Sequence, residues 1–128
     1  MNNNPEVSGL KILIAEDDEM SAMLLTIIVK EYREKVFRAK NGIEAVDICF
    51  NNPDIDLILM DIQMPGLNGD EATRKIREFN KNVIIIAQTG LVLSTDKDKL
   101  IEAGCNNYLS KPVNRLELIT LIESYFKK

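Results

Sequence analysis

Short apolar runs alternate with helix-like segments along this chain, and this alternation constrains the fold more than any other feature. Apolar runs of strand length lie at residues 11–15, 55–60 and 82–87, and weaker runs lie at residues 35–39 and 107–110. After each run, apolar residues recur at the spacing of an amphipathic helix. Parallel strands need crossover connections, which are usually helices, so the pattern predicts a (βα)5 chain.

Local signals mark where these helices start and stop. Asp18 is predicted to be the N-cap of the first helix, because its carboxylate accepts hydrogen bonds from free backbone N–H groups. Gly104 is placed to end the fourth helix, and Asn114 with Glu117 resembles a capping box for a last helix that runs through about Phe126. The prediction of the first helix rests on the spacing of Met20, Met23, Leu24, Ile27 and Ile28.

The three strongest runs are apolar at nearly every position, which is typical of strands buried on both faces of a parallel sheet. The predicted fold is therefore α/β, a doubly wound five-stranded parallel sheet with the flavodoxin-like order 2-1-3-4-5. In such sheets the ligand site lies beyond the carboxyl ends of the strands, where the order reverses between the first and third strands. The residues that follow each strand are therefore the candidates for a site.

Length and charge limit the class of protein. With 128 residues, 45% hydrophobic and 28% charged, the chain suits one folded domain over residues 10–128 after a polar lead at residues 1–9. The 16 basic and 20 acidic residues give a net charge of -4, which argues against contact with nucleic acid or a membrane surface and favours a protein partner or a cation. No run approaches the roughly 20 apolar residues of a membrane span, and the start lacks a signal-peptide pattern, so a soluble chain is predicted.

Cysteine and histidine usage narrows the chemistry. Cys49 and Cys105 match no metal-ligand spacing, and we interpret them as inert reduced thiols in a cytoplasmic protein. The chain has no histidine, which removes the commonest general base and the commonest nitrogen ligand. Any chemistry must therefore rest on carboxylates, hydroxyl groups and lysine.

Polar side chains follow four of the five predicted strands. Glu16 and Asp17 follow the first strand, Asp61 the third, Thr89 the fourth and Lys111 the fifth. Each alone has an ordinary explanation: an aspartate that opens a loop, a hydroxyl that satisfies the backbone, a solvated surface lysine. Together they would meet at one edge of the sheet.

Three carboxylates at that edge require a counter-charge. Like charges at close range raise each other's pKa and destabilise the fold, so the cluster of Glu16, Asp17 and Asp61 predicts a bound cation. Mg²⁺ suits hard oxygen ligands, keeps several waters and takes one or two protein carboxylates together with phosphoryl oxygens. The prediction is therefore a magnesium site that also holds a phosphoryl group.

The segments "KILIAEDD", "LILMDIQMPGLNG", "IIIAQTG" and "YLSKP" occur in this order, and with them the chain resembles the receiver domains of two-component response regulators from about Lys11 to Phe126. By this resemblance, Asp61 would be the phosphoacceptor, Glu16 and Asp17 the acidic metal pair, and Thr89 the switch hydroxyl. Lys111 would be the phosphate-binding lysine, Tyr108 the switch aromatic residue, and the backbone carbonyl of Gln63 a ligand to Mg²⁺.

The resemblance also implies a function. A histidine kinase or a phosphotransfer protein would give its phosphohistidine phosphoryl group to Asp61, and the surface over residues 95–126 would then change. The chain would be a signalling domain that assists only its own phosphorylation and dephosphorylation, not an enzyme with a separate substrate. The segment "DIQMPGLNG" resembles receivers attached to hybrid histidine kinases, which favours a module of a larger chain, and dimerisation on phosphorylation stays open.

Two finer expectations concern the loops around the site. The Lys111–Pro112 bond is predicted to be cis, because an ordered turn must direct the lysine into the site and X–Pro bonds tolerate the cis form. The resemblance also implies that Gln63 and Leu91, two residues beyond Asp61 and Thr89, would flank the attacking side of the aspartyl phosphate. We expect the apolar Leu91 to exclude water more than Gln63 orients it, which predicts a long-lived phosphorylated form.

Three other classes of protein fit the sequence less well. A haloacid-dehalogenase-like phosphatase needs a second aspartate two residues after the nucleophile, where this chain has Gln63. A flavodoxin-like nucleotide or flavin binder needs a phosphate-binding loop after the first strand, where "EDDEMS" places repelling carboxylates. A receiver-like domain that is never phosphorylated has little reason to combine all the site positions.

Overall fold

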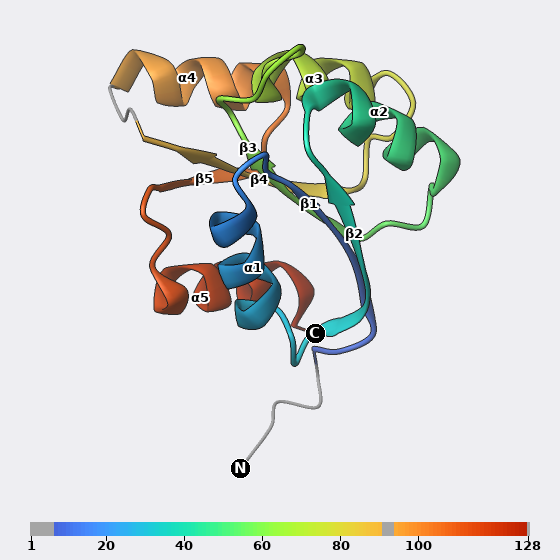
Figure 1. Cartoon of the computed structure of the whole chain (residues 1–128), viewed down its shortest axis with the longest axis vertical. Helices are drawn as coiled ribbons and strands as arrows, with labels where there is room; N and C mark the ends of the chain where they lie inside the picture. Colours follow the sequence, from blue (N-terminus) through green and yellow to red (C-terminus); the bar gives the residue numbers. More distant parts are fainter. Residues whose placement is uncertain (1–6, 91–93, 128) are drawn as a thin grey trace.

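The structure of the protein, a computed structural model, describes residues 7–90 and 94–127 and contains the five predicted βα units (Figure 1). The parallel strands lie in the order β2-β1-β3-β4-β5, so the predicted doubly wound, flavodoxin-like topology is confirmed. The elements are β1 (Leu10–Ala15), α1 (Glu19–Ile28), β2 (Arg33–Ala39), α2 (Gly42–Asn51), β3 (Leu57–Asp61), α3 (Gly69–Arg77), β4 (Ile84–Thr89), α4 (Ser94–Ala103), β5 (Asn107–Ser110) and α5 (Arg115–Phe126).

Helices cover both faces of the sheet in two layers. Helices α1 and α5 pack on one face, and α2, α3 and α4 pack on the other (Figure 1). Along the central strand β3 every residue is buried, because each of its faces contacts a helix layer. Full burial of one Leu or Ile side chain contributes roughly 1.5–3 kcal/mol, so the apolar runs supply much of the stability. Val7, within the predicted polar lead, is also buried in the layer of α1 and α5.

The predicted helix boundaries agree with the structure. The Asp18 side chain accepts a hydrogen bond from the backbone N–H of Ser21 at 2.8 Å, and Asn114 accepts one from the N–H of Glu117 at 3.0 Å. Each such cap contributes about 1 kcal/mol. Gly104 ends α4 with a φ of 118°, a conformation that disfavours residues with a side chain.

Helix α1 is a helix as predicted, but the apolar residues that indicated it lie mostly on its outer side. Met20 is 80% exposed, and Met23, Leu24 and Ile27 are also exposed. The residues that pack on the sheet are Ala22, Leu25 and Ile28. Helix α1 is apolar around most of its circumference, so the spacing predicted a helix without showing which side faces the sheet.

Three local features complete the fold. Strand β3 begins at Leu57 and not at Ile55, and the Asp56 carboxylate just before it accepts a hydrogen bond from the backbone N–H of Lys11 at 2.9 Å. Both cysteines are free and buried, and burial raises the pKa of the Cys49 thiol to about 12, which agrees with an inert thiol. Within residues 7–90 and 94–127, every helix is too short or too polar to cross a membrane.

Candidate functional site

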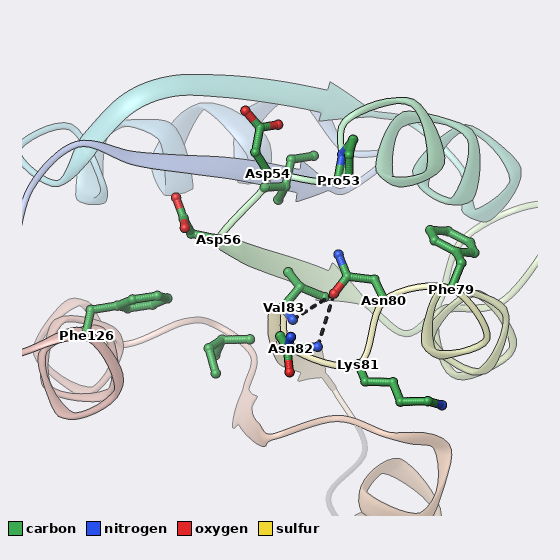
Figure 2. A pocket seen from close by; sticks show the side chains of 11 residues that line it. Pro53, Asp54, Asp56, Phe79, Asn80, Lys81, Asn82, Val83 and Phe126 are labelled. Atoms are coloured by element: carbon green, nitrogen blue, oxygen red, sulfur yellow. Dashed lines mark hydrogen bonds between the residues drawn. The ribbon is translucent and has the colours of Figure 1, made fainter.

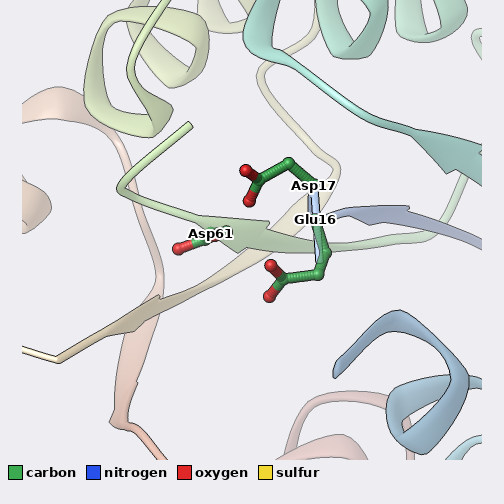
Figure 3. Close-up of side chains that lie close together, drawn as sticks. All are labelled: Glu16, Asp17 and Asp61. Carbon is green, nitrogen blue, oxygen red and sulfur yellow. The ribbon is translucent and has the colours of Figure 1, made fainter. Parts of the chain in front are cut away.

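The carboxyl ends of β1 and β3 bring three carboxylates together, as predicted. Figure 3 shows Glu16, Asp17 and Asp61 turned toward a common space, and their ligand oxygens lie within 4.8 Å of one another. The convergence follows from the register, because β1 and β3 are paired neighbours that end at the same edge of the sheet. Glu16 and Asp61 are 1% and 2% exposed, whereas Asp17 is exposed to solvent.

Lys111 reaches this cluster from the end of β5. Its Nζ lies 3.0 Å from Oδ1 of Asp61 and 3.3 Å from Oε1 of Glu16. The backbone N–H of Lys111 donates to the carbonyl of Thr89 at 2.9 Å, which anchors the turn to β4. The Lys111–Pro112 bond is cis, so that prediction is confirmed. We call Glu16, Asp17, Asp61 and Lys111 the carboxyl-edge site.

Burial and charge set the protonation of this site. Burial raises the pKa of Glu16, and the nearby charge of Asp61 adds to the effect, while the backbone N–H of Asp18, 3.1 Å from Oε2, acts in the opposite direction. Burial alone would lower the pKa of Lys111, but its hydrogen bond to Asp61 and the charge of Glu16 outweigh burial and raise it. Lys111 is therefore a firmly held cation.

The site fits a hard divalent cation. Oε1 of Glu16 is buried and, although Lys111 is near, accepts no hydrogen bond from any described residue. One ammonium contacts two of the three carboxylates, so negative charge remains in excess. Carboxylate oxygens are the ligands that Mg²⁺ prefers, and the exposure of Asp17 leaves room for waters on the ion.

The loop after β3 holds Asp61 in place. The backbone N–H of Gln63 donates to Oδ1 of Asp61 at 3.2 Å, and the N–H of Gly69 donates to the carbonyl of Ile62 at 3.0 Å. A Cβ atom at Gly69 would lie 2.3 Å from the Asp61 carbonyl oxygen, so only glycine lets α3 begin this close to the strand. The exposed Gln63 side chain lies on this loop.

The other predicted residues lie around the site. Thr89 is buried at the end of β4 beside Ser110 of β5. Tyr108 is half-buried against the layer of α2, α3 and α4, and Nζ of Lys97 lies 5.3 Å from its ring centroid. Leu91, predicted to tune the phosphoryl lifetime, lies outside the described residues.

Arg38 of β2 contacts the site and was not predicted. Its Nε and Nη2 donate to the backbone carbonyl of Glu16 at 2.9 and 2.7 Å, and its Nη1 lies 3.1 Å from Oε1 of Glu19. The guanidinium therefore fixes the backbone that carries Glu16 and Asp17. The only signal in the sequence is a charged residue inside the run "KVFRA", which alone does not indicate a role.

Comparisons with known proteins point to one family. Residues 12–123 match the family model described as response regulator receiver domain. The polar-differentiation response regulator DivK of Brucella anthropi is 32% identical over 116 residues, which cover 89% of this chain and 94% of that protein. Hybrid signal transduction histidine kinase I of Dictyostelium discoideum is 36% identical over 136 residues, covering 96% of this chain and 8% of the kinase.

Solved structures agree with this match. The receiver domain of Ssk1 from Saccharomyces cerevisiae, crystallised with the histidine phosphotransfer signalling protein Ypd1, is similar with a TM-score of 0.86 and 35% identity, over 94% of this chain and 90% of that one. The receiver domain of the sensor histidine kinase PA1611 from Pseudomonas aeruginosa is similar with a TM-score of 0.80 and 35% identity, over 93% of this chain and 98% of that one. That structure has a magnesium ion coordinated in its active site cleft.

Proposed function

Because the chain belongs to the response regulator receiver domain family, whose members carry signals in two-component phosphorelays, we propose that Asp61 accepts a phosphoryl group from a phosphohistidine on a partner protein. The observation that carries this proposal is the buried Asp61 carboxylate, held 3.0 Å from the Lys111 ammonium beside two further carboxylates. We expect Mg²⁺ to be required, held by Asp17, Asp61 and the Gln63 carbonyl, with Glu16 acting through water.

In the transfer, an oxygen of the Asp61 carboxylate forms a bond to phosphorus while the bond from phosphorus to the donor's imidazole nitrogen breaks. A carboxylate oxygen attacks with its own lone pair, so no general base is needed, and the leaving imidazole nitrogen keeps the electron pair of the broken bond. Lys111 and the Gln63 N–H hold Oδ1, which fixes the orientation of the carboxylate. Bound Mg²⁺ would neutralise charge on the phosphoryl oxygens. The lack of histidine is therefore no obstacle.

The outer side of α1 supports a protein as the donor. Met20, Met23, Leu24 and Ile27, which we call the α1 outer stripe, are between 48% and 80% exposed. Contiguous exposed apolar surface of this kind marks protein interaction sites. Helix α1 begins two residues after Asp17, so a protein that covers the stripe reaches the carboxyl-edge site. The complex of a similar receiver with a histidine phosphotransfer protein favours the same class of donor here.

Acetyl phosphate with Mg²⁺ tests the acceptor. We expect the wild type to gain one acid-labile phosphoryl group by intact-protein mass spectrometry, and Asp61→Asn to gain none. Asp56→Asn, which changes a carboxylate at the opposite end of β3, is the matched control and should be phosphorylated like the wild type. A phosphoryl group retained by Asp61→Asn would place the nucleophile elsewhere, and an unlabelled wild type would favour an interaction domain that is never phosphorylated.

Phosphorylated Ypd1 tests the docking surface. Joint replacement of Met23 and Ile27 by alanine removes apolar surface from the α1 outer stripe, and we expect transfer from phosphorylated Ypd1 to slow by about tenfold. Phosphorylation by acetyl phosphate should not change. Phe50→Ala is the matched control, because Phe50 is 65% exposed on α2 in the other helix layer. Equal slowing by Phe50→Ala would show that the stripe is not the docking surface.

The signal is proposed to leave through α4, β5 and α5. A phosphoryl oxygen at Asp61 would draw the Thr89 hydroxyl inward, Tyr108 would follow, and the surface over residues 97–126 would repack. Amide shifts in NMR spectra before and after phosphorylation test this: changes should extend along β5 and α4. Changes confined to the surroundings of Asp61 would contradict the switch.

A further inference from the structure

A groove of about 350 Å³ lies beside the carboxyl-edge site, between α1, the end of β4 and the turn after Lys111. Most of its lining is apolar. The single side chain that β4 contributes is Gln88. The other lining residues are Ser21, Leu24, Leu25, Pro112 and Val113.

Gln88 is an unusual residue for its position in the strand. Side chains alternate along β4, and Ile84 and Ile86 of the same face pack in the layer of α1 and α5. Gln88 is only 2% exposed, and its amide nitrogen Nε2 is buried with no hydrogen-bond partner among the described residues. An unpaired buried amide destabilises the free protein, and an apolar residue would avoid that cost. The amide is therefore suited to a partner that arrives on binding.

The groove is continuous with the proposed docking surface. Leu24 belongs both to the α1 outer stripe and to the groove, and Lys111 belongs both to the groove and to the carboxyl-edge site. A protein that covers the stripe and brings a phosphohistidine to Asp61 must therefore cover the mouth of the groove. The occupant is then a part of that protein.

We propose that the groove receives a side chain of the phosphohistidine donor that has an aliphatic body and a neutral carbonyl or hydroxyl oxygen, which accepts a hydrogen bond from Nε2 of Gln88. This inference rests on the proposed function. A carboxylate is disfavoured because Glu16 and Asp61 already place negative charge around Lys111, and an ammonium group offers no acceptor. Gln88 thereby selects among donors, because a donor without the acceptor leaves a buried amide unpaired.

Small probes test the chemistry of the groove. In NMR titrations of the whole chain, cyclopentanone, which has a carbonyl acceptor, should shift the Gln88 side-chain amide signals and the Val113 methyl signals. Cyclopentane should shift the methyl signals only and bind more weakly. In Gln88→Met, which keeps the length of the side chain, the preference for cyclopentanone should disappear. Equal binding of both probes to the wild type, or a preference that survives in Gln88→Met, would overturn the proposal.

Phosphotransfer tests the role of Gln88 toward a protein donor. Phosphorylated Ypd1 should transfer to Gln88→Met about fivefold more slowly than to the wild type, which is the loss of one hydrogen bond. Acetyl phosphate should label both proteins at the same rate, because it does not fill the groove. If Gln88→Met slowed phosphorylation by both donors, the substitution would have damaged the phosphorylation site. If it slowed phosphorylation by neither donor, the protein donor would not contact Gln88. Each result overturns the proposal. Failure of acetyl phosphate to label the wild type contradicts the proposed function instead.

Discussion

The two ends of the parallel sheet both carry aspartates, but in different surroundings. At the amino edge, Asp54 forms an ion pair with Lys11 and its side chain is 58% exposed, while Asp56 accepts a hydrogen bond from the Lys11 N–H. At the carboxyl edge, Glu16 and Asp61 are buried and share one ammonium. Carboxylates near strand ends are therefore not informative by themselves. Buried carboxylates in excess over their cations distinguish the carboxyl edge, where we propose the site.

The cavities at the two edges differ in the same way. The amino-edge cavity, about 400 Å³, is lined in part by Phe79, Asn80 and Phe126 (Figure 2). There the Oδ1 of Asn80 accepts hydrogen bonds from the N–H groups of Asn82 and Val83, at 3.1 and 3.0 Å (Figure 2). In the slightly smaller groove beside the carboxyl edge, the Gln88 amide nitrogen has no partner among the described residues. The two cavities are similar in volume, so the unpaired amide distinguishes them and their size does not.

Lys111→Met should give the largest effect. The variant removes the ammonium that neutralises charge at Asp61, and phosphorylation by acetyl phosphate should slow by roughly 10²-fold, as for loss of one preorganised electrostatic group. Lys11→Met, which removes the lysine of the amino edge, should phosphorylate at the wild-type rate. Initial rates by mass spectrometry compare the two. Similar phosphorylation rates for Lys111→Met and Lys11→Met would mean that the lysine of the carboxyl edge matters no more than the lysine of the amino edge.

Asp17→Asn should weaken Mg²⁺ binding by about tenfold, because the variant removes one charged ligand and each 1.4 kcal/mol is a factor of ten. Asp54→Asn removes an exposed carboxylate at the amino edge and should leave the affinity unchanged. Isothermal titration of each variant with MgCl₂ gives the dissociation constants. Unchanged affinity in Asp17→Asn would remove that residue from the metal site.

Glu16→Gln should stabilise the metal-free protein near neutral pH. Because burial raises the pKa of Glu16, the folded state binds the proton more tightly than the unfolded state, and stability falls as pH rises from about 4.3 through the folded value. The variant removes this loss. Its melting temperature without Mg²⁺ should exceed that of the wild type at pH 7.5 and match it below about pH 4. If the difference in melting temperature between Glu16→Gln and the wild type grew toward acidic pH, the pKa of Glu16 would be shifted in the opposite direction.

Arg38→Met should have the smallest effect. It removes two hydrogen bonds to the Glu16 carbonyl, which loosens the backbone of the metal ligands, and Mg²⁺ affinity should fall about three- to fivefold. Arg77→Met is the control at the other edge, where Arg77 donates to the Gly104 carbonyl at 2.9 Å. That variant should lower the melting temperature without changing Mg²⁺ affinity. If Arg38→Met instead lowered the melting temperature and left the Mg²⁺ affinity unchanged, Arg38 would act only on stability.

Much of the fold is predictable from the sequence, because the spacing of the apolar residues and the residues that mark helix ends agree at each element. Asp18, Gly104 and Asn114 mark helix ends through local chemistry, so they were predictable without the tertiary structure. The convergence of Glu16 with Asp61 was also predictable, since the strand order alone places both at one edge.

Long-range contacts were not predictable from local pattern. Arg38 meets the Glu16 carbonyl only because β2 pairs with β1, and nothing near Arg38 in the chain indicates that carbonyl. The exposure of Met20 and Met23 depends on which side of α1 faces the sheet, and a helix apolar on both sides does not reveal this. Gln88 directly follows the apolar run at residues 82–87, which predicted only a strand. These features depend on tertiary packing.

A single Mg²⁺ titration followed by ¹H–¹⁵N NMR compares both edges of the sheet most directly. We predict saturable shifts at the amides of Asp17, Asp61 and Gln63, and larger ones when beryllofluoride is added with Mg²⁺ as a phosphoryl mimic. The amides of Asp54 and Asp56, at the other end of the same sheet, should stay unchanged. Shifts of equal size at both edges, or none at Asp17 and Asp61, would contradict the claim that the carboxyl edge is the cation and phosphoryl site.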